Sequence, residues 1–260
     1  MMAPPLPAAS VCGRFTNRPW LPEPAGISKL VLGTSGDMEP MSFTHADGKV
    51  VGLDVDIGRF MAQAMGVKLT TRTLPFTELL PALQRGEVDV VISNLTITPK
   101  RNMSVAFVGP YMTSGKCILT KQESLARAQQ AEDLNTPDTR IAVMKGSTSE
   151  DFVRTLLPQA TVMLADSRTA AVDLVKSDQA GGMLTDYPIC MSSLKNHPEA
   201  GFVSLFSLLS YEPIGIALPG NDPLFVNWTE NFLMRMESLS ALDEIGKRWF
   251  GEYAEAMQSE

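Results

Sequence analysis

Short apolar runs alternate with segments of helical periodicity through much of the chain, and this alternation restricts the possible folds more than any other feature. Residues 30–32, 67–73 and 88–93 have the length and composition of strands. Between them, apolar side chains recur at helical spacing over 54–66 and 77–86, where Asp54 and Thr77 are predicted N-caps. Strands that alternate with helices pair in parallel, so we predict an α/β fold with parallel sheets.

The same alternation occurs again further along the chain. Strands are predicted over 141–144, 161–164 and 182–185, with helices from Ser149, over 169–177 and from Pro188. A β-like connector runs through Tyr111–Leu119, and a second through Pro213–Leu218, before helices over 222–236 and 240–250. Two connectors predict a discontinuous first lobe of 28–114 and 213–260, a second lobe of 115–212, and a two-strand hinge between them.

Composition excludes several classes of protein. The chain has 260 residues, 44% hydrophobic and 20% charged residues and a net charge of -7, which indicates a globular protein and no nucleic-acid partner. No apolar run is long enough for a membrane helix. The proline-rich residues 1–27 lack a signal-peptide core, so we expect the export signal to be absent from this sequence. Cys12, Cys117 and Cys190 show no metal-binding spacing, and their disulfide state is left open.

Ligands of parallel α/β sheets bind where the strands end, and one candidate cation stands at such a position. The segment 93–101 leads from a buried strand into a helical turn that Thr98 caps and Pro99 starts. Arg101 lies in that first turn, where a cation opposes the helix dipole, so it suits carboxylate binding. A solvated arginine is the alternative.

Two further segments follow predicted strands. Residues 145–150 contain a capping box of Ser147 and Glu150 that leaves the Thr148 hydroxyl and backbone amides free for an anion. Asp186 ends an apolar strand directly before a helix, where its carboxylate is suited either to an N-cap role or to binding of an ammonium group. A plain helix start is the simpler interpretation of both segments.

The order of these motifs resembles the family 3 solute-binding proteins, the polar amino-acid receptors of ABC importers. The resemblance covers about nine-tenths of the chain. The motifs that carry it are Leu32–Pro40, Val51–Ile57, Leu80–Asp89, Thr96–Arg101, Gly146–Thr148, Leu184–Pro188 and Lys247–Gly251. The resemblance implies a bilobed periplasmic-binding-protein type II fold.

The resemblance also implies a function and a set of ligand contacts. Arg101 would clamp the α-carboxylate of a free amino acid, with Asn94, Thr96 and Thr148 assisting, and Asp186 would accept the α-ammonium. A guanidinium and a carboxylate on opposite lobes satisfy both poles of a zwitterion only when the lobes close. We therefore expect a monomeric, periplasmic or otherwise extracytoplasmic receptor that serves a membrane permease and needs no cofactor or metal.

The expected side-chain end of this site is mainly apolar. Phe76 matches a family aromatic, Met38 stands where an aromatic is common, and Met144 is expected nearby, although ordinary core packing is the alternative for all three. This pocket favours a neutral or apolar side chain. Glu39 and Glu78 lie near these loops and leave a basic side chain open.

Three other functions are possible on the same scaffold: a dehydratase, a ligand-sensing domain and an interaction protein without a ligand. Cyclohexadienyl dehydratases resemble amino-acid receptors and use a glutamate just after the Asp186 position, where this chain has Ile189, which cannot transfer a proton. A ligand-sensing domain of a membrane kinase or channel normally has membrane spans. An interaction protein that has lost its ligand is disfavoured by the retention of Arg101 with Asp186.

Overall fold

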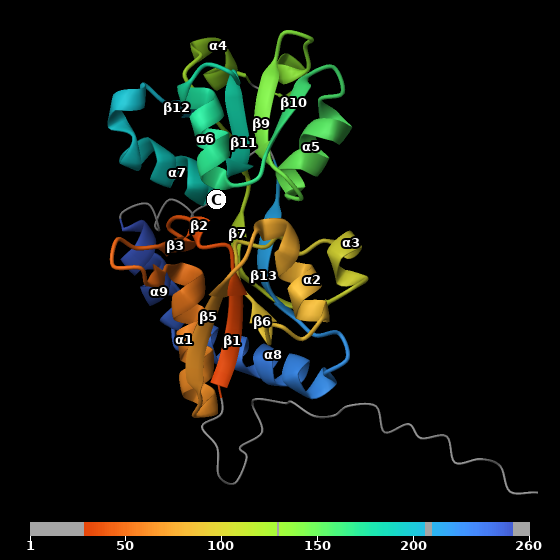
Figure 1. The fold of residues 1–260 in the computed structure, drawn as a ribbon, viewed down its shortest axis with the longest axis vertical. Helices are drawn as coiled ribbons and strands as arrows, with labels where there is room; N and C mark the ends of the chain where they lie inside the picture. The colour runs from red at the N-terminus through yellow and green to blue at the C-terminus, as the bar shows by residue number, and fades with distance from the viewer. Residues whose placement is uncertain (1–28, 129, 206–209, 252–260) are drawn as a thin grey trace, which may run out of the picture.

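The chain folds into two lobes, each built on a five-stranded sheet with helices packed against it (Figure 1). The structure, a computed structural model, describes residues 29–128, 130–205 and 210–251. The strand order is β5-β1-β6-β13-β7 in lobe one and β10-β9-β11-β8-β12 in lobe two. The bilobed α/β fold expected from the sequence is confirmed, whereas the predicted leader, 1–27, lies outside the described residues.

Lobe one combines segments from both ends of the described chain. Its main sheet contains β1 (Lys29–Thr34), β5 (Lys68–Thr73), β6 (Val90–Val91), β7 (Ala106–Ser114) and β13 (Glu212–Leu218). A small antiparallel sheet consists of β2 (Asp37–Met38), β3 (Ser42–Thr44) and β4 (Val50–Val51). The helices are α1 (Leu53–Met65), α2 (Leu79–Gln84), α3 (Pro99–Asn102), α8 (Pro223–Ser238) and α9 (Ala241–Phe250), with a 3₁₀ turn at Phe76–Glu78.

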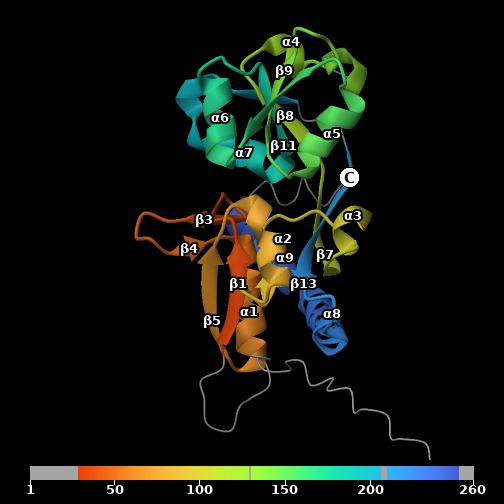
Figure 2. The ribbon, with the colours of Figure 1, turned by 45° about the vertical axis from the view of Figure 1, so that its right-hand side comes forward.

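Lobe two is built from the intervening part of the chain. Its strands are β8 (Lys116–Thr120), β9 (Arg140–Met144), β10 (Thr161–Ala165), β11 (Gly182–Asp186) and β12 (Val203–Leu205). Its helices are α4 (Glu123–Ala126), α5 (Thr148–Leu156), α6 (Arg168–Lys176) and α7 (Tyr187–Asn196), with 3₁₀ turns at Ala131–Leu134 and Pro198–Ala200. Figure 2 shows this lobe above lobe one, with β7 and β13 rising toward it.

Both sheets are mixed rather than wholly parallel. The strands of the β-α-β units pair in parallel, β5 with β1 and β1 with β6 in lobe one, and β10 with β9 and β9 with β11 in lobe two. Strands β13 and β7 pair antiparallel in lobe one, as do β8 and β12 in lobe two. The antiparallel strands include those by which the chain passes between the lobes, because the chain must enter and leave each lobe at the same edge of the sheet.

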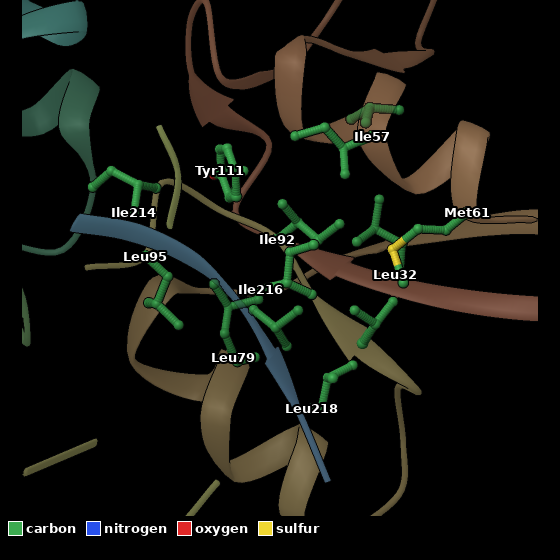
Figure 3. Packing of buried hydrophobic residues seen from close by; sticks show 14 of the residues in the cluster. Leu32, Ile57, Met61, Leu79, Ile92, Leu95, Tyr111, Ile214, Ile216 and Leu218 are labelled. Atoms are coloured by element: carbon green, nitrogen blue, oxygen red, sulfur yellow. The ribbon is translucent and has the colours of Figure 1, made fainter. Parts of the chain in front are cut away.

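The core of lobe one lies between its main sheet and the helices that cover it. Figure 3 shows Leu32 of β1 packed near Ile57 and Met61 of α1, with Ile216 of β13 among the same buried side chains. Each of these side chains is almost inaccessible to solvent, and burying one such side chain contributes about 1.5–3 kcal/mol. The apolar side chains of α1 and β1 thus pack the helix on the sheet and hold in place the strand ends at which the site lies. No helix in the described ranges is long and apolar enough to cross a membrane.

The N-caps predicted for the first two helices are wrong. Helix α1 begins at Leu53, after Gly52, which has a φ of 135°. A Cβ atom at Gly52 would lie 2.2 Å from the Met41 carbonyl oxygen, so only glycine fits at this position. Asp54 therefore lies inside the helix, where its carboxylate accepts hydrogen bonds from the Tyr111 hydroxyl and from the backbone N–H of Asn94. Thr77 lies within a 3₁₀ turn that precedes α2.

Buried Asp54 predicts a pH dependence of stability. Burial raises its pKa from 3.8 to about 7, against the lowering effect of the Tyr111 and Asn94 hydrogen bonds. The folded state then binds this proton more tightly than the unfolded state, so the group lowers the free energy of unfolding as pH rises from about 4 to about 7. We expect Asp54→Asn, which resembles the protonated acid, to cost less stability at about pH 8 than at about pH 5. Urea unfolding at both pH values checks this, and an equal cost at both contradicts it.

The disulfide question left open by the sequence is answered in part. Cys117 of β8 and Cys190 of α7 form a disulfide, so the strand that enters lobe two is covalently linked to the helix that follows Asp186. Cys12 lies outside the described residues. The link holds β8, which begins at Lys116, against the helix that begins directly after Asp186.

Candidate functional site

One cleft collects all eight residues that the sequence nominated. Met38, Phe76, Asn94, Thr96 and Arg101 line it from lobe one, and Met144, Thr148 and Asp186 line it from lobe two. Most of these residues stand at or just after a strand end, after β6, β9 and β11 in particular. The structure therefore brings together the predicted residues, and their contacts indicate what the cleft can bind.

Arg101 reaches across the cleft from lobe one. Thr98 caps α3 as predicted, accepting a hydrogen bond from the Arg101 amide, and this places the side chain against the Phe76 ring with 5.7 Å from Cζ to the ring centroid. The guanidinium donates to the carbonyl oxygens of Thr96, at 2.8 Å, and Gly146, at 3.1 Å. Burial lowers the pKa of Arg101 despite the attraction of nearby carboxylates, so an anion would relieve the cost of desolvating this charge.

Asp186 faces Asn94 across the cleft. Asp186 occupies the N-cap position of α7 but makes no capping hydrogen bond, and its Oδ2 accepts from Asn94 Nδ2 at 2.7 Å. Asn94 adopts a left-handed backbone, with a φ of 47°, which asparagine tolerates better than most residues. The side-chain oxygen Asn94 Oδ1 is buried and has no hydrogen-bond partner among the residues that the structure describes. An acceptor left unpaired in this way favours a ligand that carries an N–H or O–H donor.

Lys116 is a buried cation that the sequence prediction missed. Its side chain is 1% exposed, and its Nζ lies 2.5 Å from Asp186 Oδ1, 2.7 Å from Thr148 Oγ1 and 3.5 Å from Glu212 Oε2. A lysine at the start of the apolar run Cys117–Leu119 was the available signal, because a buried ammonium requires a carboxylate partner.

Glu212 completes this network from β13, the strand that returns to lobe one. Its Oε2 accepts a hydrogen bond from Thr148 at 3.1 Å. Burial raises the pKa of Glu212, but the Lys116 charge and several side-chain hydrogen bonds more than offset this, so the pKa lies below its usual value. Lys116, Asp186 and Glu212 therefore form one cluster, which we call the acid–lysine cluster, with formal charges of one positive and two negative.

Arg168 is a further functional candidate that the sequence prediction missed, besides Lys116 and Glu212. It stands at the start of α6, lines the same cleft, and reaches lobe one, where its Nε donates to the Asp37 carbonyl oxygen at 2.9 Å. Its Nη1 donates to Ser193 Oγ at 3.1 Å. Burial lowers the pKa of Arg168, while Asp37 and Glu39 partly offset this effect. In the sequence Arg168 follows the polar residues Asp166 and Ser167, and nothing in this segment distinguished it from a solvent-exposed arginine.

The remaining lining is largely apolar. Met38 and Phe76 of lobe one and Met144 of lobe two belong to one buried hydrophobic cluster and also line the cleft. Core packing, the alternative for all three, is therefore present, and their contact with a ligand stays a prediction. Ile189 of α7 also lines the cleft and is 1% exposed. The structure places the two acids considered for a basic side chain elsewhere: Glu39 accepts from Asn196, and Glu78 lies near Arg85 at 3.5 Å.

The loop 145–150 has a modified form of the predicted capping box. Ser147 is the N-cap of α5 and accepts from the Glu150 amide at 3.3 Å, as expected. The Glu150 carboxylate accepts from the Gly146 amide instead of the Ser147 amide. This contact turns the Gly146 carbonyl toward Arg101 and leaves Thr148 in the acid–lysine cluster.

The two lobes are in contact across the cleft. Direct hydrogen bonds join Asn94 to Asp186, Arg101 to Gly146, and Arg168 to Asp37. Asn, Arg and Asp side chains therefore hold the lobes together around the lining residues, which is the arrangement that closure around a small molecule requires. Within the described ranges, no group of His, Cys, Asp and Glu is arranged to hold a metal ion.

Residues 30–252 match the sequence model of the bacterial extracellular solute-binding proteins, family 3. Among curated proteins, the arginine-binding extracellular protein ArtP of Bacillus subtilis (strain 168) is 29% identical over 233 residues, covering 87% of this chain and 88% of the relative. The cyclohexadienyl dehydratase of Pseudomonas aeruginosa is 25% identical over 220 residues, covering 85% of this chain and 82% of the relative.

Solved structures give the same picture. An ancestral arginine-binding protein bound to arginine superposes with a TM-score of 0.80 at 31% identity, covering 86% of this chain and 98% of that chain. The ancestral amino acid-binding protein AncCDT-1, a precursor of cyclohexadienyl dehydratase, gives 0.78 at 34% identity, covering 85% and 95%. Amino-acid-binding proteins, one of them a precursor of an enzyme, therefore share this fold.

Proposed function

We propose, since this chain belongs to family 3 of the bacterial extracellular solute-binding proteins, that it is an extracytoplasmic receptor which closes around one free α-amino acid. It would present the closed form to the permease of an ABC importer. Relatives named as arginine-binding and glutamine-binding proteins support the amino-acid class. The proposal also includes the predicted monomeric state and the division into lobes at residues 114–115 and 212–213.

The observation that carries the proposal is a guanidinium from lobe one and a carboxylate from lobe two at a single cleft. Arg101 contacts only neutral carbonyl oxygens and an aromatic ring among the described residues, so its charge is available for a carboxylate. Asp186 uses one oxygen for Lys116 and the other for Asn94, but each carboxylate oxygen accepts more than one hydrogen bond. An α-ammonium would donate to Asp186 and to the unpaired Asn94 Oδ1.

Closure follows from the same contacts. Thr96 and Thr148 approach to 3.4 Å between their hydroxyl oxygens across the cleft, so ligand groups bound near them contact both lobes. A ligand that binds the closed form more tightly than the open form shifts the equilibrium toward closure. The hinge movement would be absorbed where β7 passes into β8 and where β13 returns.

A dehydratase on the same scaffold is the second candidate, because a cyclohexadienyl dehydratase is among the relatives. Ile189 is buried at the cleft wall and its side chain cannot act as a general acid. Lys116 is committed to two carboxylates and a hydroxyl. These contacts favour binding over turnover.

A ligand screen tests the proposed function. We expect at least one free amino acid at about 100 times its dissociation constant to add about 2.7 kcal/mol of stability, which raises Tm by roughly 5–10 °C. Mass spectrometry of denatured protein should release the same compound if it co-purifies. Failure of every amino acid to bind would contradict the proposal, and turnover of prephenate or arogenate would replace it with the dehydratase.

A further inference from the structure

The charges in the cleft are not evenly balanced. Lys116 lies against Asp186 and Glu212, so the acid–lysine cluster carries one negative charge overall. By contrast, no described carboxylate forms an ion pair with the guanidinium of Arg101 or Arg168, although Asp37 and Glu39 attract the Arg168 charge from a greater distance. The charges of the cleft therefore favour one further cation at the cluster and an anion at each of the two guanidiniums.

Both guanidiniums have donors to spare. Two N–H groups of Arg101 are used, on the carbonyls of Thr96 and Gly146, and two N–H groups of Arg168 are used, on the Asp37 carbonyl and Ser193. The other N–H groups have no acceptor in the described part of the chain, and a guanidinium fork binds a carboxylate through such groups. The Asp37 carboxylate accepts from the Arg168 backbone amide rather than from its guanidinium.

The positions of the two arginines separate the two anions. Arg101 stacks on Phe76, close to Asn94 and Thr96, where the α-carboxylate belongs in the proposed function. Arg168 contacts Asp37, whose neighbour Met38 lines the expected side-chain end of the cleft. The prediction of a neutral or apolar side chain used Met38, Phe76 and Met144 and left this cation out.

We infer that the amino acid bound here has an acidic side chain, with its α-carboxylate on Arg101, its side-chain carboxylate on Arg168 and its ammonium between Asp186 and Asn94. The inference rests on the proposed function and specifies its ligand. A molecule with two carboxylates and one ammonium complements the net charge of the cluster and the two guanidiniums. A basic side chain would place a second cation beside Arg168.

Isothermal titration calorimetry with wild-type protein tests the inference by comparing each acid with its amide. The acidic members are glutamate and aspartate, and the neutral isosteres are glutamine and asparagine. We expect the better acid to bind about tenfold to a hundredfold more tightly than its amide, as a charged hydrogen-bonded contact provides. Equal or tighter binding of the amide, or of arginine or lysine, overturns the inference but leaves the proposed function in place.

Two variants assign the preference to Arg168. Arg168→Gln should reduce the acid-to-amide ratio of affinities to within a few-fold of one, and Arg168→Lys, which keeps the charge, should retain part of it. The ratio is the readout because Arg168 also joins the lobes, so a structural loss would weaken acid and amide equally and overturn the assignment. Circular dichroism and Tm confirm that each variant is folded.

Two diacids without an amine, glutarate and succinate, test the two-anion assignment separately from the proposal that the ligand is an amino acid. Weaker binding than that of the matching amino acid supports both the inference and the ammonium contact at Asp186. Binding as tight as that of the amino acid keeps the two-anion assignment but overturns the amino-acid ligand. If no compound in the panel binds, both the inference and the proposed function are contradicted.

Discussion

Arg101→Ala should nearly abolish ligand binding while leaving the protein folded. Removing one partner of a desolvated, hydrogen-bonded charge pair costs about 2–5 kcal/mol, which corresponds to an affinity roughly 30-fold to several thousand-fold weaker. The side chain also holds the Gly146 carbonyl of lobe two, so its loss weakens the closed form as well. Calorimetric titration with the amino acid found by the ligand screen measures the loss.

Lys100→Ala is the matched control, because it removes a neighbouring cation from the same short helix. The Lys100 side chain is 82% exposed and lies 3.5 Å from Asp151, and an exposed pair of this kind contributes at most about 1 kcal/mol. We therefore expect an affinity within about fivefold of wild type. Equal losses for Lys100→Ala and Arg101→Ala would show that the two cations act only through general charge, and the role of Arg101 would be wrong.

Local patterns predicted the fold well because each depends on few residues. The helical spacing of Ile57 and Met61 places one face of α1 on the core, and Thr98 caps α3 through neighbours three residues away. The prediction of Asp54 as an N-cap was wrong because residues distant in the sequence determine its position. Asp54 is held inside the helix by Tyr111 and Asn94, which no local pattern connects to it.

The candidate site was also predictable where it depends on the local order of strands and loops, and not where it depends on contacts between distant segments. Strand ends of parallel β-α-β units meet at one edge of a sheet, so the segment with Arg101 and the strand end at Asp186 could be assigned to the site from the chain order. The role of Asn94 came from the family resemblance. Arg168 and Glu212 could not, because their contacts arise from packing between lobes and from a strand that returns late in the sequence. Their contribution is mainly electrostatic, and it alters the ligand expected from the apolar lining.

Lys116→Met should be among the most destabilising single substitutions in lobe two. It removes the ammonium that neutralises Asp186 and Glu212 and leaves two buried carboxylates without their cation. Breaking a buried ion pair in this way costs about 3–5 kcal/mol, which urea unfolding measures directly. Lys100→Met, a change of the same type at an exposed lysine, should cost less than about 1 kcal/mol.

A second substitution distinguishes loss of the ion pair from loss of packing. If the cost of Lys116→Met arises from unpaired carboxylates, the double variant Lys116→Met/Asp186→Leu should recover a large part of it, because an apolar pair of similar volume is often as stable as a buried ion pair. The double variant should also lose ligand binding, since Asp186 provides the proposed ammonium contact. Additive costs of the two substitutions would mean that Lys116 acts through its aliphatic stem, and the acid–lysine cluster would then not control the charge of the cleft.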